Sequence, residues 1–344
     1  MNILITGGAG FVGACLARAL LARGQFDGQP VRRLVLLDQF AVPADLSARP
    51  EVQAHTGPLL EHCAALREGR GPGAGDPIDA VFHLASAVSG ECELDFELGL
   101  RSNIDSTRAL LDALRARTEA GAAAPKFVFA SSIAVFGPDP AYPFPERVGD
   151  DTLPMPQTSY GTHKLICEHM VADYTRKGYI DGRAARLVTV TVRPGRPNGA
   201  ASSFFSGIIR EPLAGDDAVL PVDTSVCHPV ATVHSMVNGL IAVGEASREA
   251  FVGRSAITLP GLNVSVQQML DALETVAGPA VRGRVKLQRD ERIAGIVANW
   301  PRGVVTPRAH ALGLQAEPDF ETVIRRYIDD CRRENPAALR GLDG

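Results

Sequence analysis

The chain has 344 residues, of which 45% are hydrophobic and 22% charged, an ordinary composition for one large or two moderate globular domains. Its formal net charge of −4 points to neither a nucleic-acid nor an anionic-membrane partner, so we expect a small-molecule substrate. No apolar run approaches the roughly 20 residues of a membrane helix. The first expected strand begins at residue 2, which leaves no room for a signal peptide. Six scattered cysteines predict reduced thiols in a cytoplasmic protein.

The N-terminal stretch predicts a strand, a glycine-rich turn and a helix. An apolar run at residues 3–5 is followed by glycines at three-residue spacing and then by a helical pattern over residues 14–23. In this order the glycines indicate a dinucleotide site, because they permit a tight turn and close approach of a pyrophosphate to the helix N-terminus. The residues expected to contact the cofactor are Gly7, Gly10, Phe11, Val12 and Gly13.

A second buried strand is predicted at residues 34–37, and it ends in Asp38. An acidic residue at this point can hydrogen-bond the adenosine ribose and would repel the extra phosphate of NADP. No arginine follows Asp38 closely, and Arg32 and Arg33 precede the strand. NAD is therefore the expected cofactor, although a surface aspartate at a strand end would give the same pattern.

Further apolar runs and helical patterns complete the N-terminal part of the chain. The expected strands are residues 52–55, 80–84, 126–130 and 187–192, and the expected long helices are residues 93–118 and 160–177. Their alternation predicts an α/β fold with a Rossmann-type, doubly wound parallel sheet. The segment 137–156 contains six prolines and is expected to be a functional loop.

Beyond Pro194 the pattern changes to short strands and separate helices, expected at residues 230–246, 264–277 and 320–333. We therefore expect residues 1–194 to form an NAD-binding domain, to which helices and strands from the C-terminal part of the chain also contribute. Residues 195–344 would be mainly a smaller substrate-binding region, with the substrate in the crevice between the two parts.

Tyr160 and Lys164 stand four residues apart at the start of an expected helix, so they project from one face. A free phenol has a pKa of about 10, too high for a base at neutral pH. A nearby ammonium and a positive nicotinamide ring favour the phenolate. Such a tyrosine can take a proton from a substrate alcohol while hydride passes to NAD. Alone, the pair is commonplace; its position after the fifth strand favours the catalytic interpretation.

A hydroxyl at the end of the fifth strand would lie at the carboxyl edge of the sheet, where ligands bind. We expect Ser132 to hold the reacting oxygen beside Tyr160. Ser131 is the competitor, because successive strand residues point to opposite faces and only one of them can serve. Two hydroxyls that simply cap the strand end are the structural alternative.

Together these segments resemble the extended short-chain dehydrogenase/reductases of the NAD-dependent epimerase/dehydratase family. The resemblance covers essentially the whole chain and rests on residues 7–13, Asp38, 83–86, Asn103, Ser132, Tyr160 with Lys164, and 193–194. It implies that Ser132 and Tyr160 act at the reacting oxygen, that Lys164 binds the nicotinamide ribose, and that Asn103 supports the site. It also implies a homodimer through the two long helices and a cofactor lined by Leu84, Ala85, Ser86 and Pro194.

Two departures from the family pattern are informative. The aspartate that usually follows the third strand's glycine and contacts adenine is Pro58 here, so this contact is lost or comes from backbone at Leu59. The acidic pair that sugar-nucleotide dehydratases carry after the serine position is Ile133 and Ala134. Elimination of water is therefore not expected.

Residues 193–215, together with 88–90 and 158–183, resemble the D-erythronate dehydrogenases, a group that oxidises a four-carbon sugar acid with NAD. The resemblance implies oxidation of D-erythronate to 2-dehydro-D-erythronate. Arg196 offers a planar cation that can hold a carboxylate with two hydrogen bonds. Asn198, Ser202 and Ser203 can serve hydroxyls, and Ser89 lies where the loop after the fourth strand should meet both the nicotinamide and the substrate.

The histidines and cysteines suggest no metal site. His83 is expected to be a packed core residue, and His163 faces differently from Tyr160. His228 could reach the substrate, although a structural role is favoured. Two other functions stay open: a nucleotide-sugar 4-epimerase that keeps NAD bound, and a non-catalytic NAD(H)-sensing module. The intact Ser132, Tyr160 and Lys164 argue against the sensor.

Overall fold

The structure is a computed structural model that describes residues 1–72, 75–195 and 201–342. The chain divides into two compact units. Unit 1 contains residues 1–135, 158–187 and 237–257, and unit 2 contains residues 136–157, 188–236 and 258–344. Every helix in the described part of the chain is too short or too polar to span a lipid bilayer.

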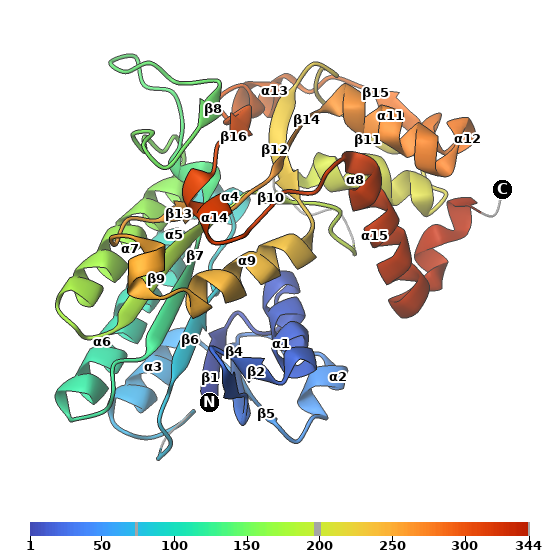
Figure 1. Ribbon diagram of the computed structural model, residues 1–344. Coiled ribbons are helices and arrows are strands. Elements are labelled where there is room, and N and C mark those ends of the chain that lie inside the picture. The colour runs from blue at the N-terminus through green and yellow to red at the C-terminus, as the bar shows by residue number, and fades with distance from the viewer. Residues whose placement is uncertain (73–74, 196–200, 343–344) are drawn as a thin grey trace. The chain divides into compact units, whose positions relative to one another are not determined.

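Unit 1 is built on a sheet with the strand order β13-β9-β7-β6-β1-β4-β5 (Figure 1). Its strands are β1 (Asn2–Thr6), β4 (Arg33–Asp38), β5 (Val52–Thr56), β6 (Ala80–His83), β7 (Lys126–Ser132), β9 (Asp181–Leu187) and β13 (Ile257–Thr258). The chain runs outward from β1 through β4 to β5, then returns to the other side of β1. This reversal makes a switch point between β1 and β6, and ligands bind outside the carboxyl ends of strands at such a point. The predicted doubly wound sheet is confirmed.

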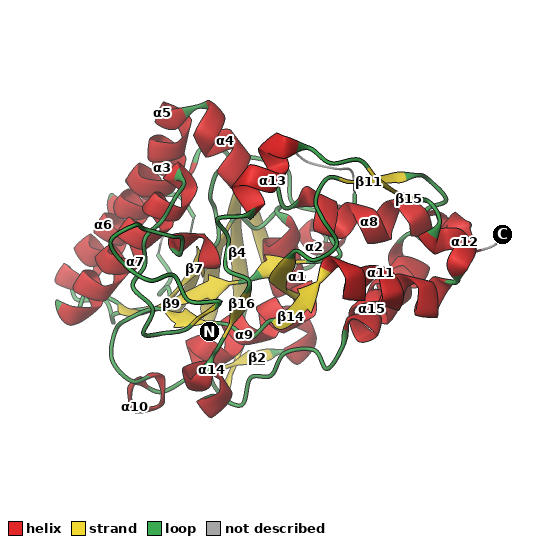
Figure 2. Ribbon diagram, turned by 90° about the horizontal axis from the view of Figure 1, so that it is seen from above, coloured by secondary structure: helices red, strands yellow, loops and turns green. Residues whose placement is uncertain are grey.

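Helices cover both faces of this sheet. They are α1 (Phe11–Arg23), α3 (Leu59–Arg67), α6 (Ser106–Glu119), α7 (Ser159–Arg176) and α9 (Val233–Glu245). Helices α3, α6 and α7 lie side by side on one face, as both views show (Figures 1 and 2). Phe127 and Phe129 of β7 belong to the apolar core of that face. Val128 points the other way, where a Cβ on Gly244 of α9 would lie 3.0 Å from its side chain.

Two predicted elements were wrong in their bounds. Instead of one helix over residues 93–118, the chain forms α4 (Ser89–Leu94), α5 (Phe96–Gly99), a π-helical turn (Leu100–Asp105) and α6. The break lies at Asp95, whose backbone is extended and whose carboxylate accepts a hydrogen bond from Leu98 N at 2.9 Å. An N-cap of this kind starts a new helix instead of continuing the old one.

The sixth strand was predicted at residues 187–192, but the strand of the main sheet is β9, which overlaps that prediction only at Leu187, and β10 (Thr189–Val190) lies within it. Arg183 and Arg186 made the true strand look polar, yet both are buried. Arg186 pairs with Glu168 and Arg183 with Asp181. Buried charges are tolerated where they are paired, and this pairing is invisible in local sequence.

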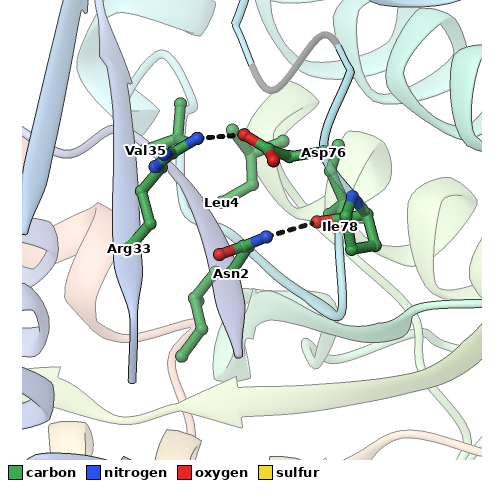
Figure 3. Close-up of a pocket in the computed structure, with 8 residues that line it drawn as sticks. Asn2, Leu4, Arg33, Val35, Asp76 and Ile78 are labelled. Atoms are coloured by element: carbon green, nitrogen blue, oxygen red, sulfur yellow. Dashed lines mark hydrogen bonds and ion pairs between the residues drawn. The ribbon is translucent and has the colours of Figure 1, made fainter. Parts of the chain in front are cut away.

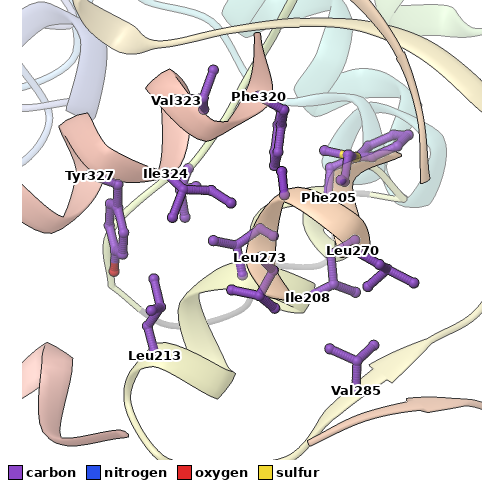
Figure 4. Close-up of a cluster of buried hydrophobic side chains, with 14 of the residues drawn as sticks. Phe205, Ile208, Leu213, Leu270, Leu273, Val285, Phe320, Val323, Ile324 and Tyr327 are labelled. Carbon is purple, nitrogen blue, oxygen red and sulfur yellow. The ribbon is translucent and has the colours of Figure 1, made fainter. Parts of the chain in front are cut away.

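Unit 2 contains smaller sheets and three longer helices. One sheet has three strands: β10 pairs with β12 (Cys227–Ala231), which pairs with β14 (Leu262–Ser265). Two sheets have two strands each. In one, β11 (Ala218–Leu220) pairs with β15 (Val285–Leu287), and in the other β8 (Arg147–Val148) pairs with β16 (Gly303–Val304). The longer helices are α8 (Ser203–Leu213), α11 (Val266–Ala277) and α15 (Phe320–Glu334). Side chains such as Phe205, Ile208 and Ile324 fill an apolar core among them (Figure 4).

The remaining short elements lie in both units. They are β2 (Gln25–Phe26), β3 (Gln29–Pro30), α2 (Ala44–Ser47), α10 (Arg248–Phe251), α12 (Pro279–Arg282), α13 (Glu291–Val297), α14 (Pro307–Ala311) and the 3-10 turns Ile133–Val135 and Pro336–Leu342.

Candidate active site

The glycine turn has the geometry that its spacing predicts. Gly7 has φ 73°, and a Cβ there would lie 2.8 Å from the backbone nitrogen of Ala85. A Cβ on Gly13 would lie 2.0 Å from the carbonyl oxygen of Gly7, so side chains have no room at either position. Helix α1 begins at Phe11, and no side chain of the described residues caps it. The first-turn N–H groups therefore face out of the helix end, where an anion can bind.

Asp38, at the end of β4, lies beside this turn. One carboxylate oxygen accepts a hydrogen bond from Ala9 N at 2.9 Å, and the other accepts one from Phe40 N at 3.0 Å. Gly57, after β5, donates its N–H to the Asp38 carbonyl at 2.9 Å, and Leu59 begins α3 directly after Pro58. A carboxylate in this position suits a ribose hydroxyl next to a pyrophosphate on α1.

The end of β6 meets the same turn. Leu84 N donates to Thr6 O at 3.1 Å, and Ala85 N donates to Thr6 Oγ1 at 3.2 Å. The buried Asn103 lies in the π-helical turn, and its Oδ1 accepts from Ser86 Oγ at 3.0 Å and from Ala87 N at 2.7 Å. Asn103 thus fixes the backbone that follows β6. Single π-helical turns of this kind occur frequently at functional sites.

His83 is a packed core residue, as expected. It is fully buried, with Nδ1 at 2.6 Å from Thr6 Oγ1 and Nε2 at 2.8 Å from Thr107 Oγ1. Burial, with a smaller effect of the Lys164 charge, lowers the pKa of His83 to about 3. The imidazole is therefore neutral, and both nitrogens are engaged.

Tyr160 and Lys164 lie in the first turns of α7, which Thr158 caps by accepting a hydrogen bond from Gly161 N at 3.0 Å. The Lys164 ammonium is buried, donates to the Ala130 carbonyl at 2.8 Å, and lies 5.5 Å from the centre of the half-buried Tyr160 ring. The two side chains thus share one face, close to the end of β7.

The two serines at the end of β7 differ in their surroundings. Ser131 is buried, and its hydroxyl donates to Glu168 Oε1 at 2.5 Å. Ser132 is half-buried, and its oxygen accepts from Ala134 N at 3.1 Å. Ser131 is committed to α7, which leaves Ser132 as the hydroxyl available to a ligand.

The sequence interpretation missed the partner of Ser131. Glu168 of α7 forms a bidentate ion pair with Arg186 of β9, both N–O distances being 2.8 Å, and both side chains are buried. A signal was present in the spacing, because Glu168 follows Lys164 by the same four residues that separate Lys164 from Tyr160.

The other predicted site residues are distributed over both units. Ser89 begins α4 in unit 1. In unit 2, Pro194 follows Arg193, whose carbonyl accepts from Arg210 at 2.8 Å, and Ser202 directly precedes α8. Arg196 and Asn198, the predicted carboxylate and hydroxyl partners, lie outside the described residues.

His228 of unit 2 is fully enclosed. Its Nε2 lies 2.7 Å from Thr189 Oγ1, its Nδ1 lies 3.1 Å from Pro301 O, and its ring stacks on Phe205 with centroids 5.2 Å apart. Burial lowers its pKa to about 4. These contacts give His228 a structural role. Among the described residues, no group of three or more His, Cys, Asp or Glu side chains could hold a metal ion.

A small pocket lies at the amino ends of β1 and β4, where Arg33 pairs with Asp76 and Asn2 donates to the Pro77 carbonyl at 3.0 Å (Figure 3). Ligands of doubly wound sheets bind at the opposite, carboxyl ends of the strands. This pocket is therefore separate from the candidate active site, and Arg33 is remote from Asp38.

Residues 3–255 match the model of the NAD dependent epimerase/dehydratase family. The chain belongs to this family. The resemblance inferred from the motifs is thereby confirmed, and NAD is the cofactor in the family's description.

Similar proteins include two full-length relatives and several solved structures. The chain is 47% identical to a D-erythronate dehydrogenase of Cupriavidus necator over 96% of this chain and 98% of that protein. It is 38% identical to a D-erythronate dehydrogenase of Haemophilus influenzae over 96% and 99%, respectively. A nucleoside-diphosphate-sugar epimerase structure from Agrobacterium tumefaciens has a TM-score of 0.88 at 40% identity, covering 96% of this chain and 94% of that one. L-Threonine 3-dehydrogenase from Trypanosoma brucei, with a TM-score of 0.79 at 20% identity over 97% and 98%, shares the fold.

Proposed function

We propose that this chain oxidises D-erythronate at carbon 2 to 2-dehydro-D-erythronate and reduces NAD⁺ to NADH. The observation that carries the proposal is the 47% identity, over 96% of the chain, to the D-erythronate dehydrogenase of Cupriavidus necator. The arrangement of Tyr160, Lys164 and Ser132 at the end of β7 supports an alcohol oxidation.

The residues present fit a dinucleotide. Side chains are excluded at Gly7 and Gly13, the N-terminus of α1 is open, and the Asp38 carboxylate lies beside the turn. These features suit a pyrophosphate and an adenosine ribose with a free 2′-hydroxyl, which is the chemistry of NAD and not of NADP.

The reaction needs a base for the C2 hydroxyl proton. Ser132 orients that hydroxyl, Tyr160 takes the proton, and the buried Lys164 ammonium lies beside the Tyr160 ring. NAD, when bound, accepts the hydride that leaves carbon 2. The proton thus resides on Tyr160 and the product is the 2-oxo acid.

Recognition of the sugar acid is assigned to the segment after β10. Arg196 holds the carboxylate, Asn198 and Ser202 serve hydroxyls, and Ser89 meets the nicotinamide and the substrate. Arg196→Ala should raise KM for the acid far more than it changes the Kd of NAD. An unchanged KM would remove Arg196 from the carboxylate site.

We also propose a homodimer formed through α6 and α7, with their flanking helices α4 and α5. Exposed apolar side chains support it, since Leu94 is 91%, Phe96 58% and Ile166 39% exposed. Sedimentation equilibrium of the full chain tests the proposal.

The deciding experiment measures NADH absorbance with NAD⁺ and a panel of four-carbon sugar acids, with UDP- and GDP-sugars alongside. Rapid NADH formation with D-erythronate supports the dehydrogenase. The alternative is a nucleotide-sugar 4-epimerase, which the epimerase name of the 40% identical Agrobacterium structure favours. Epimerised nucleotide sugar, tightly retained NAD and no NADH with any acid would overturn the proposal. Binding of NAD with no turnover of either substrate class would leave a sensing module.

A further inference from the structure

Successive residues at the end of β7 engage successive turns of α7. The Ala130 carbonyl accepts a hydrogen bond from Lys164 at 2.8 Å, and the Ser131 hydroxyl donates to Glu168 at 2.5 Å. Ser132, the next residue, carries the hydroxyl assigned to the substrate. On α7, Tyr160, Lys164 and Glu168 follow at intervals of four residues and therefore lie along one face.

Glu168 also joins this contact to a third element. Arg186 of β9, the residue paired with Ser131 in the parallel register, donates from Nε and Nη2 to the two Glu168 oxygens, each at 2.8 Å. The side chains of Arg186 and Glu168 are 6% and 5% exposed. A single carboxylate thus connects α7, β7 and β9 through three hydrogen bonds.

Stability alone does not explain why such a pair is buried. The free energy of removing two charges from water offsets much of their mutual attraction, so a protein with well-packed apolar residues at the same positions is often as stable. A planar guanidinium that binds both carboxylate oxygens instead fixes distance and orientation, because the fork geometry permits one arrangement. The apolar contacts of α7, through side chains such as Cys167 and Val171, are less directional.

We propose that Ser131, Glu168 and Arg186 form a positioning clamp that sets how α7 lies on β7. The clamp and the Lys164 contact anchor α7 at two successive turns, which fixes both its rotation and its translation along the strand. Tyr160, one turn before Lys164, is thereby held at a set distance from Ser132. The consequence for catalysis rests on the proposed function, since the clamp residues act through Tyr160 and Lys164 and do not touch substrate.

The test compares Ser131→Ala with a matched control, Thr175→Val. Thr175 also links α7 to β9, accepting a hydrogen bond from Gly182 N at 3.0 Å, but at the far end of the helix. Because displacement of a reacting group by about 1 Å can cost about 100-fold in rate, Ser131→Ala should lower kcat about 10- to 100-fold. The Kd of NAD should stay within about twofold, and Thr175→Val should keep the wild-type kcat.

The double variant Glu168→Met/Arg186→Met provides a second test, because an apolar pair can replace a buried ion pair without loss of folding. It should fold, bind NAD and show the same loss of kcat. The clamp would be overturned if Ser131→Ala and the double variant lost stability to the same extent but both kept the wild-type kcat.

Crystal structures of wild type and variants provide a readout that does not need turnover. We expect Tyr160 to move relative to Ser132 by more than about 0.5 Å in the clamp variants and to stay in place in Thr175→Val. An unmoved Tyr160 would overturn the clamp. A wild-type protein that produces no NADH from any acid would instead refute the proposed function, and these structures would still decide the clamp.

Discussion

The apolar core of unit 2 and the carboxyl end of β7 in unit 1 are held together by different interactions. In unit 2, α8, α11 and α15 enclose a core of apolar side chains such as Phe205, Ile208 and Leu273 (Figure 4), while a buried carboxylate, Glu317, lies elsewhere in the unit. In unit 1, the carboxyl end of β7 buries Lys164, Glu168 and Arg186. Apolar burial is non-directional and stabilises a fold, whereas buried hydrogen-bonded charges specify an arrangement. The difference indicates that the apolar core around α8, α11 and α15 chiefly supplies stability and that the end of β7 in unit 1 supplies geometry.

The largest expected effect is loss of turnover without loss of folding. Tyr160→Phe removes the proposed base, and general-base catalysis contributes about 100- to 10,000-fold, so kcat should fall by that factor. The free energy of unfolding in urea should change by less than about 0.5 kcal/mol, since Tyr160 is only half-buried. Substantial residual kcat would refute the base assignment.

Tyr174→Phe is the matched control for this variant. Tyr174 lies on the same helix, and its hydroxyl donates to Asp112 at 2.7 Å. Its loss should cost about 1 kcal/mol of stability and leave kcat unchanged. The two tyrosine variants thus separate geometry for catalysis from ordinary helix packing.

In the core of unit 2 we expect a loss of stability without a loss of turnover, the opposite of the result expected for Tyr160→Phe. Ile208→Ala, at a fully buried position of α8, should lower the free energy of unfolding by about 2–5 kcal/mol because it removes apolar contacts and leaves a cavity. Urea unfolding measures the loss, and kcat of the folded enzyme should be retained. Leu287→Ala, which is 65% exposed in the same unit, should cost less than about 0.5 kcal/mol. A large kcat loss in Ile208→Ala would contradict the division of roles.

The sequence predicted the parts of unit 1 that depend on local spacing. The glycine turn and Asp38 follow from short-range steric and charge requirements, and helix α7 with Tyr160 and Lys164 follows from periodicity. Strand alternation indicated that only one of Ser131 and Ser132 can serve the substrate, and the family resemblance implied Ser132.

Most of what the sequence did not predict depends on long-range contacts. Strand β9 was misplaced because Arg186 looks like a surface residue until Glu168, 18 residues earlier, is brought beside it. The break in the helix predicted over residues 93–118 depends on Asp95 as an N-cap and on the π-helical turn. That turn contains Asn103, which bonds to Ala87. The Glu168–Arg186 and Asn103–Ala87 contacts join distant residues, whereas the Asp95 cap is a local signal that the interpretation did not use.

His83 in unit 1 and His228 in unit 2 are buried and neutral, which makes stability depend on pH. The folded-state pKa values of His83 and His228, about 3 and about 4, lie below the ordinary value of 6.5. As pH falls below about 6.5 the unfolded chain binds protons first, so stability is complete above that pH and is lost toward the folded values. Each histidine should contribute a slope of up to about 1.4 kcal/mol per pH unit.

Urea unfolding of wild type and His228→Gln at pH 7, 6 and 5 measures this contribution. The variant should lose less stability than wild type between pH 6 and pH 5, because one proton-binding site is missing from its unfolded state. Parallel pH profiles of the two proteins would show that His228 does not carry the effect.

The smallest expected effect is at Asp38 in unit 1, where a substitution removes one charge without changing the shape of the side chain. Asp38→Asn keeps an oxygen for Ala9 N or Phe40 N but removes the negative charge, so the Kd of NAD should rise about tenfold or less. NADP should lose less affinity than NAD, or gain some, because its extra phosphate no longer meets a carboxylate. Calorimetric titration measures both.

Asp45→Asn is the control, since that exposed carboxylate pairs with Arg18 at 2.7 Å and carries the same charge nearby. If both variants changed the NAD to NADP ratio equally, general charge would explain the preference. If only Asp38→Asn changed it, the preference would be set by one positioned carboxylate, as the buried polar groups of unit 1 set the geometry of α7.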